Sequence, residues 1–117
     1  MSAIDLILTG ALFLCQLPAT TDGDTIRCDQ GRGQRVRVFG IQAPERTDPG
    51  GPASTQAMRQ LVTGHTLTCT IRGPDSYSRK VALCRLEDGT DIAAEMVRLG
   101  QAVDWPKFSG GRYGRAQ

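Results

Sequence analysis

Four cysteines bracket two turn signals in this 117-residue chain, and their placement strongly constrains the fold. The first pair stands on either side of an Asp-Gly dipeptide at 22–23, one of the commonest hairpin signals. The second pair flanks a Gly-Pro-Asp turn at 73–75. We expect each pair to lie on the two arms of a hairpin and to form a disulfide in an oxidising compartment. The expected disulfides are Cys15–Cys28 and Cys69–Cys84.

Other roles for the cysteines compete with this prediction. A tetrathiolate zinc site needs two closely spaced pairs of the C-x2-C kind, which this chain lacks. A second alternative stays open: the four residues would simply be small, buried and apolar.

The size and composition are those of one globular domain. At 12.6 kDa, with 39% hydrophobic and 22% charged residues, the chain is large enough for a single core and too short for two. A net charge of +2 is compatible with a polyanionic partner, but it does not argue for one.

The N-terminal apolar run, residues 4–14, resembles the core of a signal peptide. Residues 1–5 carry no Lys or Arg, Asp5 interrupts the run, and the run is too short to span a bilayer. We therefore assign residues 1–10 to a leader remnant, a disordered segment or the start of a strand. Residues 11–117 are assigned to one domain.

Polar and apolar residues alternate at 25–28 and 35–39, the period of half-buried strands, with a turn at 29–33 between them. Helical spacing begins at Pro52 and ends at Gly64. The expected strands are 11–17, 25–28, 35–39, 66–71 and 80–86, and the expected helices are 52–64 and 92–99. This mainly β, α+β order suits a five-stranded antiparallel barrel of the oligonucleotide-binding (OB) kind with two helices.

Four polar residues could serve phosphodiester chemistry, which needs oxygen ligands for a metal, a guanidinium for the phosphate and a carboxylate that acts on water. Taken alone, Asp24 is explained by a turn, Glu45 by a solvated loop, and Arg37 and Arg79 by solvated surface positions. His65 has no acid or cysteine at ligand spacing.

Taken together, four segments resemble the staphylococcal nuclease-like (thermonuclease) family from about residue 15 to the C-terminus. The segments are Asp22-Gly-Asp-Thr25, Arg37-Val-Phe-Gly-Ile-Gln-Ala-Pro-Glu45, Asp75-Ser-Tyr-Ser-Arg79 and Val97-Arg-Leu-Gly-Gln-Ala102. The resemblance implies an OB-fold barrel and calcium-dependent hydrolysis of DNA or RNA, preferably single-stranded, with no membrane partner. Together with the paired cysteines, it also implies a secreted or periplasmic location, although no clear signal peptide is present.

The resemblance also assigns roles to individual residues. Asp24 would bind calcium, and Glu45 would act as general base toward the attacking water. Arg37 and Arg79 would hold the phosphate and stabilise its developing charge. Tyr77 would lie beside the nucleotide.

The chain departs from the family pattern at the expected metal site. Gln42 stands where the family has a calcium-binding Asp, so the site loses one negative charge and we expect weaker calcium affinity. Ala43 replaces a Thr that contributes only its backbone carbonyl. Ser76 and Ser78 replace a basic residue and a glycine beside Tyr77.

The C-terminus departs as well, because family members continue past a segment like 109–113 into a third helix that this sequence lacks. Loss of that helix would reduce buried apolar area, which the disulfides would offset. An exposed strand edge could exchange between copies, so the oligomeric state stays open. We expect Trp105 and Phe108 to cap the core rather than to stack on bases.

Two other functions compete with the nuclease. Gln42 favours a non-catalytic OB-fold module that binds single-stranded nucleic acid or a protein partner. The cysteines alone would fit a secreted structural domain without a site.

Overall fold

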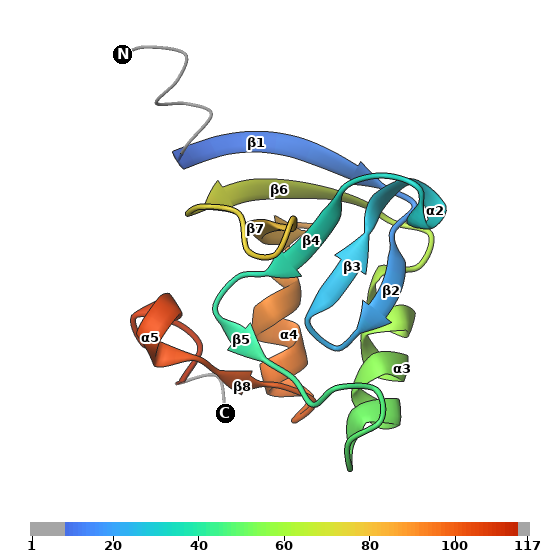
Figure 1. The fold of residues 1–117 in the computed structure, drawn as a ribbon, viewed down its shortest axis with the longest axis vertical. Helices are drawn as coiled ribbons and strands as arrows, with labels where there is room; N and C mark the ends of the chain where they lie inside the picture. The colour runs from blue at the N-terminus through green and yellow to red at the C-terminus, as the bar shows by residue number, and fades with distance from the viewer. Residues whose placement is uncertain (1–8, 115–117) are drawn as a thin grey trace.

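The structure, a computed structural model, describes residues 9–114 and forms eight strands over that range. Six of them make one sheet with the order β1-β6-β7-β4-β3-β2, in which only β4 and β7 run parallel (Figure 1). The remaining two form a small antiparallel ladder. The strands of the large sheet are β1 (Thr9–Gln16), β2 (Ala19–Asp22), β3 (Thr25–Arg27), β4 (Arg35–Val38), β6 (Thr66–Arg72) and β7 (Lys80–Arg85). The small ladder joins β5 (Ile41–Gln42) to β8 (Val103–Asp104).

The two edges of the large sheet, β1 and β2, are neighbours in sequence, joined by Leu17 and Pro18 alone. The sheet therefore has to curl until its edges approach each other. No ladder joins the two edge strands within residues 9–114, so the sheet stays open.

The α+β class is confirmed, but the prediction of a five-stranded antiparallel barrel is wrong, because residues 9–114 form eight strands, β4 and β7 pair in parallel, and the sheet is not closed. One reason is the Leu17-Pro18 step, because Leu17 has a left-handed backbone (φ 46°) and Pro18 has no N–H to donate to a ladder. These two residues end β1 and leave β2 as a separate strand. Strands β5 and β8 are only two residues long, too short for any alternation to show.

Both predicted helices are present. Helix α3 (Gly51–Val62) carries Pro52 in its first turn, where the missing N–H costs nothing. Helix α4 (Ile92–Arg98) is capped by Asp91, whose Oδ1 accepts hydrogen bonds from the N–H groups of Ala93 and Ala94 at 2.9 and 3.4 Å. Two four-residue elements complete the described chain, α2 (Cys28–Gly31) in the predicted turn and α5 (Pro106–Ser109).

The core lies between the concave face of the large sheet and the two longer helices. Among residues 9–114, no helix is long and apolar enough to cross a bilayer. The largest fully buried side chains are Ile26, Val36, Val38, Ile41, Met58, Val62, Leu67, Ile92 and Met96.

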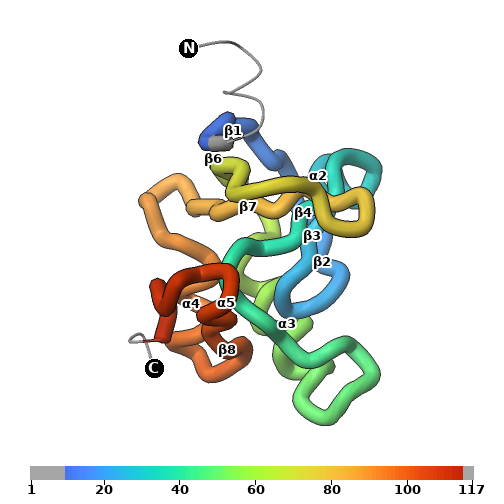
Figure 2. The backbone as a smooth tube through the Cα atoms, turned by 60° about the vertical axis from the view of Figure 1, so that its left-hand side comes forward, coloured from blue at the N-terminus to red at the C-terminus, as the bar shows by residue number. Residues whose placement is uncertain are grey.

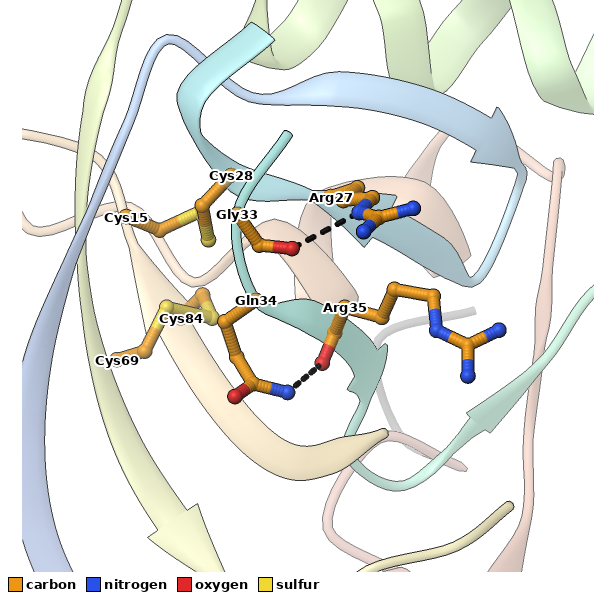
Figure 3. The surroundings of a disulfide bond; sticks show 8 residues. All are labelled: Cys15, Arg27, Cys28, Gly33, Gln34, Arg35, Cys69 and Cys84. Atoms are coloured by element: carbon orange, nitrogen blue, oxygen red, sulfur yellow. Dashed lines mark hydrogen bonds between the residues drawn. A yellow bond between two sulfur atoms is a disulfide. The ribbon is translucent and has the colours of Figure 1, made fainter. Parts of the chain in front are cut away.

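Both predicted disulfides form, which excludes a thiolate metal site (Figure 3). Cys69 and Cys84 face each other directly across β6 and β7, as expected for hairpin arms. The hairpin prediction for the first pair is wrong, because Cys15 lies on β1 and Cys28 begins α2, outside the β2–β3 hairpin. The disulfides are consistent with an extracellular or periplasmic location.

The C-terminal part of the described chain docks on the core through Tyr113. Its hydroxyl donates a 2.8 Å hydrogen bond to Asp91 Oδ2, and its ring packs so closely on Gly40 that a Cβ there would lie 2.7 Å from it. Burial and the Asp91 carboxylate raise the pKa of Tyr113 well above its ordinary value. Figure 2 shows the result, with α4, α5 and β8 grouped on one side of the molecule.

Candidate active site

A cleft of about 1120 Å³ lies where the β2–β3 turn, β5, the 74–79 loop and the segment after α4 meet. It brings together all seven predicted site residues, although they come from four separate parts of the chain. They are Asp24, Arg37, Gln42, Ala43, Glu45, Tyr77 and Arg79.

Asp24 forms the buried base of this cleft and is only 7% exposed. Its Oδ2 accepts a 2.8 Å hydrogen bond from the Ala43 N–H and lies 3.4 Å from Arg37 Nη2. Its Oδ1 accepts a bond from the Thr25 hydroxyl at 3.1 Å. Burial raises the pKa of Asp24 and the neighbouring Asp22 adds to this effect, whereas Arg37 and the Ala43 N–H oppose it.

The tight turn that presents Asp24 depends on Gly23. A Cβ at this position would lie 1.9 Å from the hydroxyl oxygen of Ser54 on α3. The turn is further fixed by Asp22, whose Oδ1 accepts the Asp24 N–H at 3.1 Å. The Asp-Gly-Asp segment is thus both a turn and the base of the cleft.

Arg37 is held on three sides. Beside its ion pair with Asp24, its Nη1 donates to the Val38 carbonyl at 2.9 Å. Its guanidinium carbon lies 5.6 Å from the centroid of the Trp105 ring, within the range of a cation–π contact. Burial lowers the pKa of Arg37 below its ordinary value, while Asp24 opposes that effect.

Arg79 reaches the same cleft from the 74–79 loop. Its Nη1 donates to the Thr25 hydroxyl at 3.3 Å, and its Nε donates to the Ser76 carbonyl at 3.1 Å. Because Thr25 in turn donates to Asp24, one hydroxyl connects Arg79 to the buried carboxylate. The Thr25 hydroxyl was not among the predicted site residues, because its role depends on an arginine 54 positions away.

Tyr77 stands at the rim of the cleft and is 88% exposed. The guanidinium carbon of Arg79 lies 5.9 Å from the centroid of its ring. Tyr77 and Ser78 both adopt left-handed backbones, with φ of 50° and 64°. The serine at 78 therefore holds a conformation that a glycine adopts more easily.

Glu45 is exposed and lines the cleft, in a turn that fixes its backbone. Its N–H donates to Asp48 Oδ2 at 3.2 Å, and its carbonyl accepts the Asp48 N–H at 2.9 Å. Gly51 permits this turn to lie against α3, because a Cβ there would be 1.9 Å from the Glu45 carbonyl oxygen. Glu45 thus lines the cleft on a turn that hydrogen bonds and close packing against Gly51 hold in place.

The oxygen atoms in the cleft fit a calcium ion in kind but supply little charge. Asp24 offers a carboxylate, Gln42 an amide oxygen and Ala43 a backbone carbonyl, all hard donors of the type calcium prefers. Over residues 9–114, no group of three His, Cys, Asp or Glu side chains is placed to hold a metal.

Two aromatic residues do not behave as predicted. Trp105 and Phe108 line the cleft, with ring centroids 4.5 Å apart in an edge-to-face contact, and Phe108 is 53% exposed. The expectation that they cap the core is wrong, because β8 pairs with β5 and carries the following segment to the cleft mouth. His65 stays outside the cleft, where it pairs with Glu87 at 2.7 Å.

Residues 35–114 match the family described as "Staphylococcal nuclease homologue". The chain belongs to this family. The match includes Arg37, Glu45 and Arg79, whereas Asp24 lies before its first residue.

Three relatives illustrate the similarity. An "Uncharacterized endonuclease" of Escherichia coli O157:H7 is 39% identical over 89 residues, covering 75% of this chain and 58% of the relative. A protein of the same name from Haemophilus influenzae is 29% identical over 97 residues, which cover 81% of this chain and 54% of the relative. "Probable endonuclease LCL3" of Clavispora lusitaniae is 32% identical over 117 residues, a match that covers 92% of this chain and 48% of the relative. The chain thus spans about half the length of the relatives it matches.

Proposed function

We propose that this family member is a calcium-dependent nuclease that hydrolyses phosphodiester bonds of DNA or RNA. The observation that carries the proposal is the convergence of Arg37 and Arg79 on the two sides of the Asp24–Thr25 pair in one cleft. The names of the relatives, which describe endonucleases, support the same reaction class.

The two guanidiniums bind the phosphate and stabilise the negative charge that develops on it as water attacks. Preorganised donors of this kind lower a barrier because they need no rearrangement during the reaction. Arg37 is oriented by Val38 and Trp105, and Arg79 is oriented by Ser76 and Thr25. A planar guanidinium also matches the paired oxygens of a phosphate.

Glu45 accepts the proton of the attacking water. Its exposed carboxylate lines the same cleft as the two arginines, on a turn held by Asp48 and Gly51. A general base must be able to reach the water that it activates, and a solvent-facing carboxylate on a fixed turn meets that requirement.

Asp24, the Gln42 amide and the Ala43 carbonyl would hold the calcium ion. When bound, calcium supplies positive charge next to the phosphate and lowers the pKa of a coordinated water. The neutral Gln42 makes the expected affinity lower than that of a site with another carboxylate. The Ala43 N–H holds Asp24 in place through a 2.8 Å hydrogen bond to Oδ2.

The substrate is a nucleic-acid strand, preferably single-stranded. The exposed ring of Tyr77 at the cleft rim offers a surface for an unpaired base, and stacking on an aromatic ring requires a base that is free of a duplex. The two disulfides favour action outside the reducing cytosol, in the periplasm or the medium.

The test is cleavage of single-stranded DNA and RNA with calcium and with a chelator. Wild type should cleave only with calcium, whereas Glu45→Gln and Arg37→Ala should reduce kcat by at least about 100-fold. Arg59→Gln, an exposed change on α3 away from the cleft, is the matched control. Absence of calcium-dependent cleavage by folded wild type would refute the proposal.

Gln42 favours one second function, a binding module without catalysis. In that case wild type would bind single-stranded nucleic acid but not cleave it, and Gln42→Asp would create cleavage. Cleavage by the wild type itself excludes this alternative.

A further inference from the structure

A row of arginines extends from the cleft across the outer face of β4 and β3. Val36 and Val38 of β4 are buried, so Arg35 and Arg37 point to the opposite face of the strand. Ile26 of β3 is likewise buried, which places Arg27 on that same outer face. Arg37 belongs to the cleft, and the other two lie beyond it.

The register of the two strands brings Arg27 and Arg35 together. They are direct partners in the β3–β4 ladder, two positions along from the Thr25–Arg37 pair. Directly opposed residues have Cβ atoms about 5 Å apart, and like charges in such pairs destabilise a sheet. Figure 3 shows both guanidinium groups extending to the same side.

Neither guanidinium is neutralised by a carboxylate of the described chain. Over residues 9–114, the ion pairs within 4 Å include neither Arg27 nor Arg35. Both are instead oriented by backbone carbonyls, Arg27 Nε by Gly33 at 2.8 Å and Arg35 Nη2 by Tyr77 at 3.4 Å. These bonds leave the other N–H groups of each fork free to bind an anion.

The hydrogen bond from Arg35 to Tyr77 connects the row to the cleft. Tyr77 lines the cleft rim, so Arg35 stands between the rim and Arg27. Along β4, Arg35 is two residues from Arg37, or about 6.6 Å at the rise of a β-strand. A spacing of that order suits successive phosphates of one nucleic-acid strand.

We propose that Arg35 and Arg27 bind phosphates that flank the scissile phosphodiester, so that the substrate strand leaves the cleft across β4 and β3. The inference rests on the proposed function for the direction of the strand and the position of the scissile bond. It adds that the preferred substrate is a polynucleotide with several phosphates beyond that bond. The two arginines contribute affinity and leave the chemical step to the cleft.

Binding measurements test this directly. A fluorescently labelled single-stranded oligonucleotide long enough to cover the row is titrated with protein without divalent metal, and anisotropy is read. We expect the double variant Arg27→Gln/Arg35→Gln to bind it at least about tenfold more weakly. The slope of log affinity against log salt should fall by about 0.7 for each phosphate that the variant no longer binds.

Two further variants distinguish an effect of the arginine row from an effect of overall charge and from a loss of folding. Arg59→Gln/Arg98→Gln removes the same charge from α3 and α4, which contribute no residue to the cleft, and should bind like wild type. Arg27→Lys/Arg35→Lys retains the charge and should keep most of the affinity. Equal binding by the Gln row variant and its control would overturn the inference.

Cleavage distinguishes this inference from the proposed function. With calcium, the Gln row variant should show raised KM and unchanged kcat on the oligonucleotide, and wild-type kinetics on a dinucleotide with one phosphodiester. If wild type cleaves neither substrate while the binding differences hold, the proposed nuclease fails and the phosphate row stands. If wild type cleaves both substrates and the row variant matches it on the oligonucleotide, the proposed nuclease function stands and only the inference about the arginine row is refuted.

Discussion

The guanidinium of Arg37 is enclosed between the carboxylate of Asp24, 3.4 Å from Nη2, and the indole of Trp105, whose centroid is 5.6 Å from the guanidinium carbon. The indole limits the directions in which this cation can swing. Trp105 is itself fixed, because its backbone N–H donates to the Gly40 carbonyl at 2.8 Å. Trp105 is therefore a positioning residue for the proposed phosphate-binding arginine.

Replacing Trp105 by Leu should lower kcat about tenfold with a small change in KM, because a desolvated cation–π contact contributes up to about 2 kcal/mol. Trp105→Phe retains an aromatic face and should restore most of kcat. Steady-state kinetics on single-stranded DNA provide the measurement. Equal losses in the Leu and Phe variants would show that the tryptophan acts only through packing.

Gln42→Asp should strengthen calcium binding by about tenfold, because calcium affinity rises with the number of charged ligands. Calorimetric titration with calcium measures the change without reference to cleavage. Gln101→Asp adds the same charge elsewhere on the cleft wall and is the control. If both variants gain equally, the effect is one of overall charge and Gln42 is not a ligand position.

Gly51→Ala should displace the turn that carries Glu45, since the added Cβ would lie 1.9 Å from the Glu45 carbonyl. Overpacking of this kind costs about 1–3 kcal/mol of unfolding free energy. Chemical denaturation should show that loss, and kcat of the folded variant should also fall. Gly64→Ala is the comparison, because its Cβ would meet nothing within 4 Å and only its backbone, with φ of 83°, would be strained. It should lose stability and keep kcat.

The lowered pKa of Glu87 predicts how the stability of the fold changes in acid. The Thr66 N–H and the His65 ring hold the pKa of Glu87 at about 2, below its ordinary value of 4.5. Because the folded-state pKa is the lower one, the ionised carboxylate stabilises the fold above pH 4.5, and this contribution is lost as the pH falls toward 2. Thermal melting should therefore show a smaller decline between these pH values for Glu87→Gln than for wild type. Identical declines would rule out a contribution from Glu87.

Local patterns were enough to predict the two longer helices, whereas the residues that meet in the cleft were predicted from the resemblance to a known family. The Asp22–Thr25 turn and the Pro44–Glu45 step are short segments whose own residues determine their shape. The Thr25 hydroxyl and Trp105 were beyond such patterns. Their roles appear only when Arg79 and Arg37, distant in sequence, are placed beside them.

The arrangement of the sheet was predicted less well, because it depends on features that are only one or two residues long. The break between β1 and β2 at Leu17-Pro18 depends on the backbone conformation of one residue. The β5–β8 ladder depends on the pairing of two strands that are each two residues long. Neither leaves a periodic signal. The disulfides could be predicted without any periodic pattern, because a disulfide needs only two cysteines that lie close together. The turn between Cys69 and Cys84 brings those two residues together.

Neither disulfide contributes a residue to the cleft. Closing loops of 13 and 15 residues stabilises a fold by roughly 3 kcal/mol each, and this gain does not depend on the cleft residues. A substitution among the residues that line the cleft can then cost some stability without bringing the domain close to unfolding. Covalent bonds remote from the cleft thus give this domain tolerance to substitutions at that face.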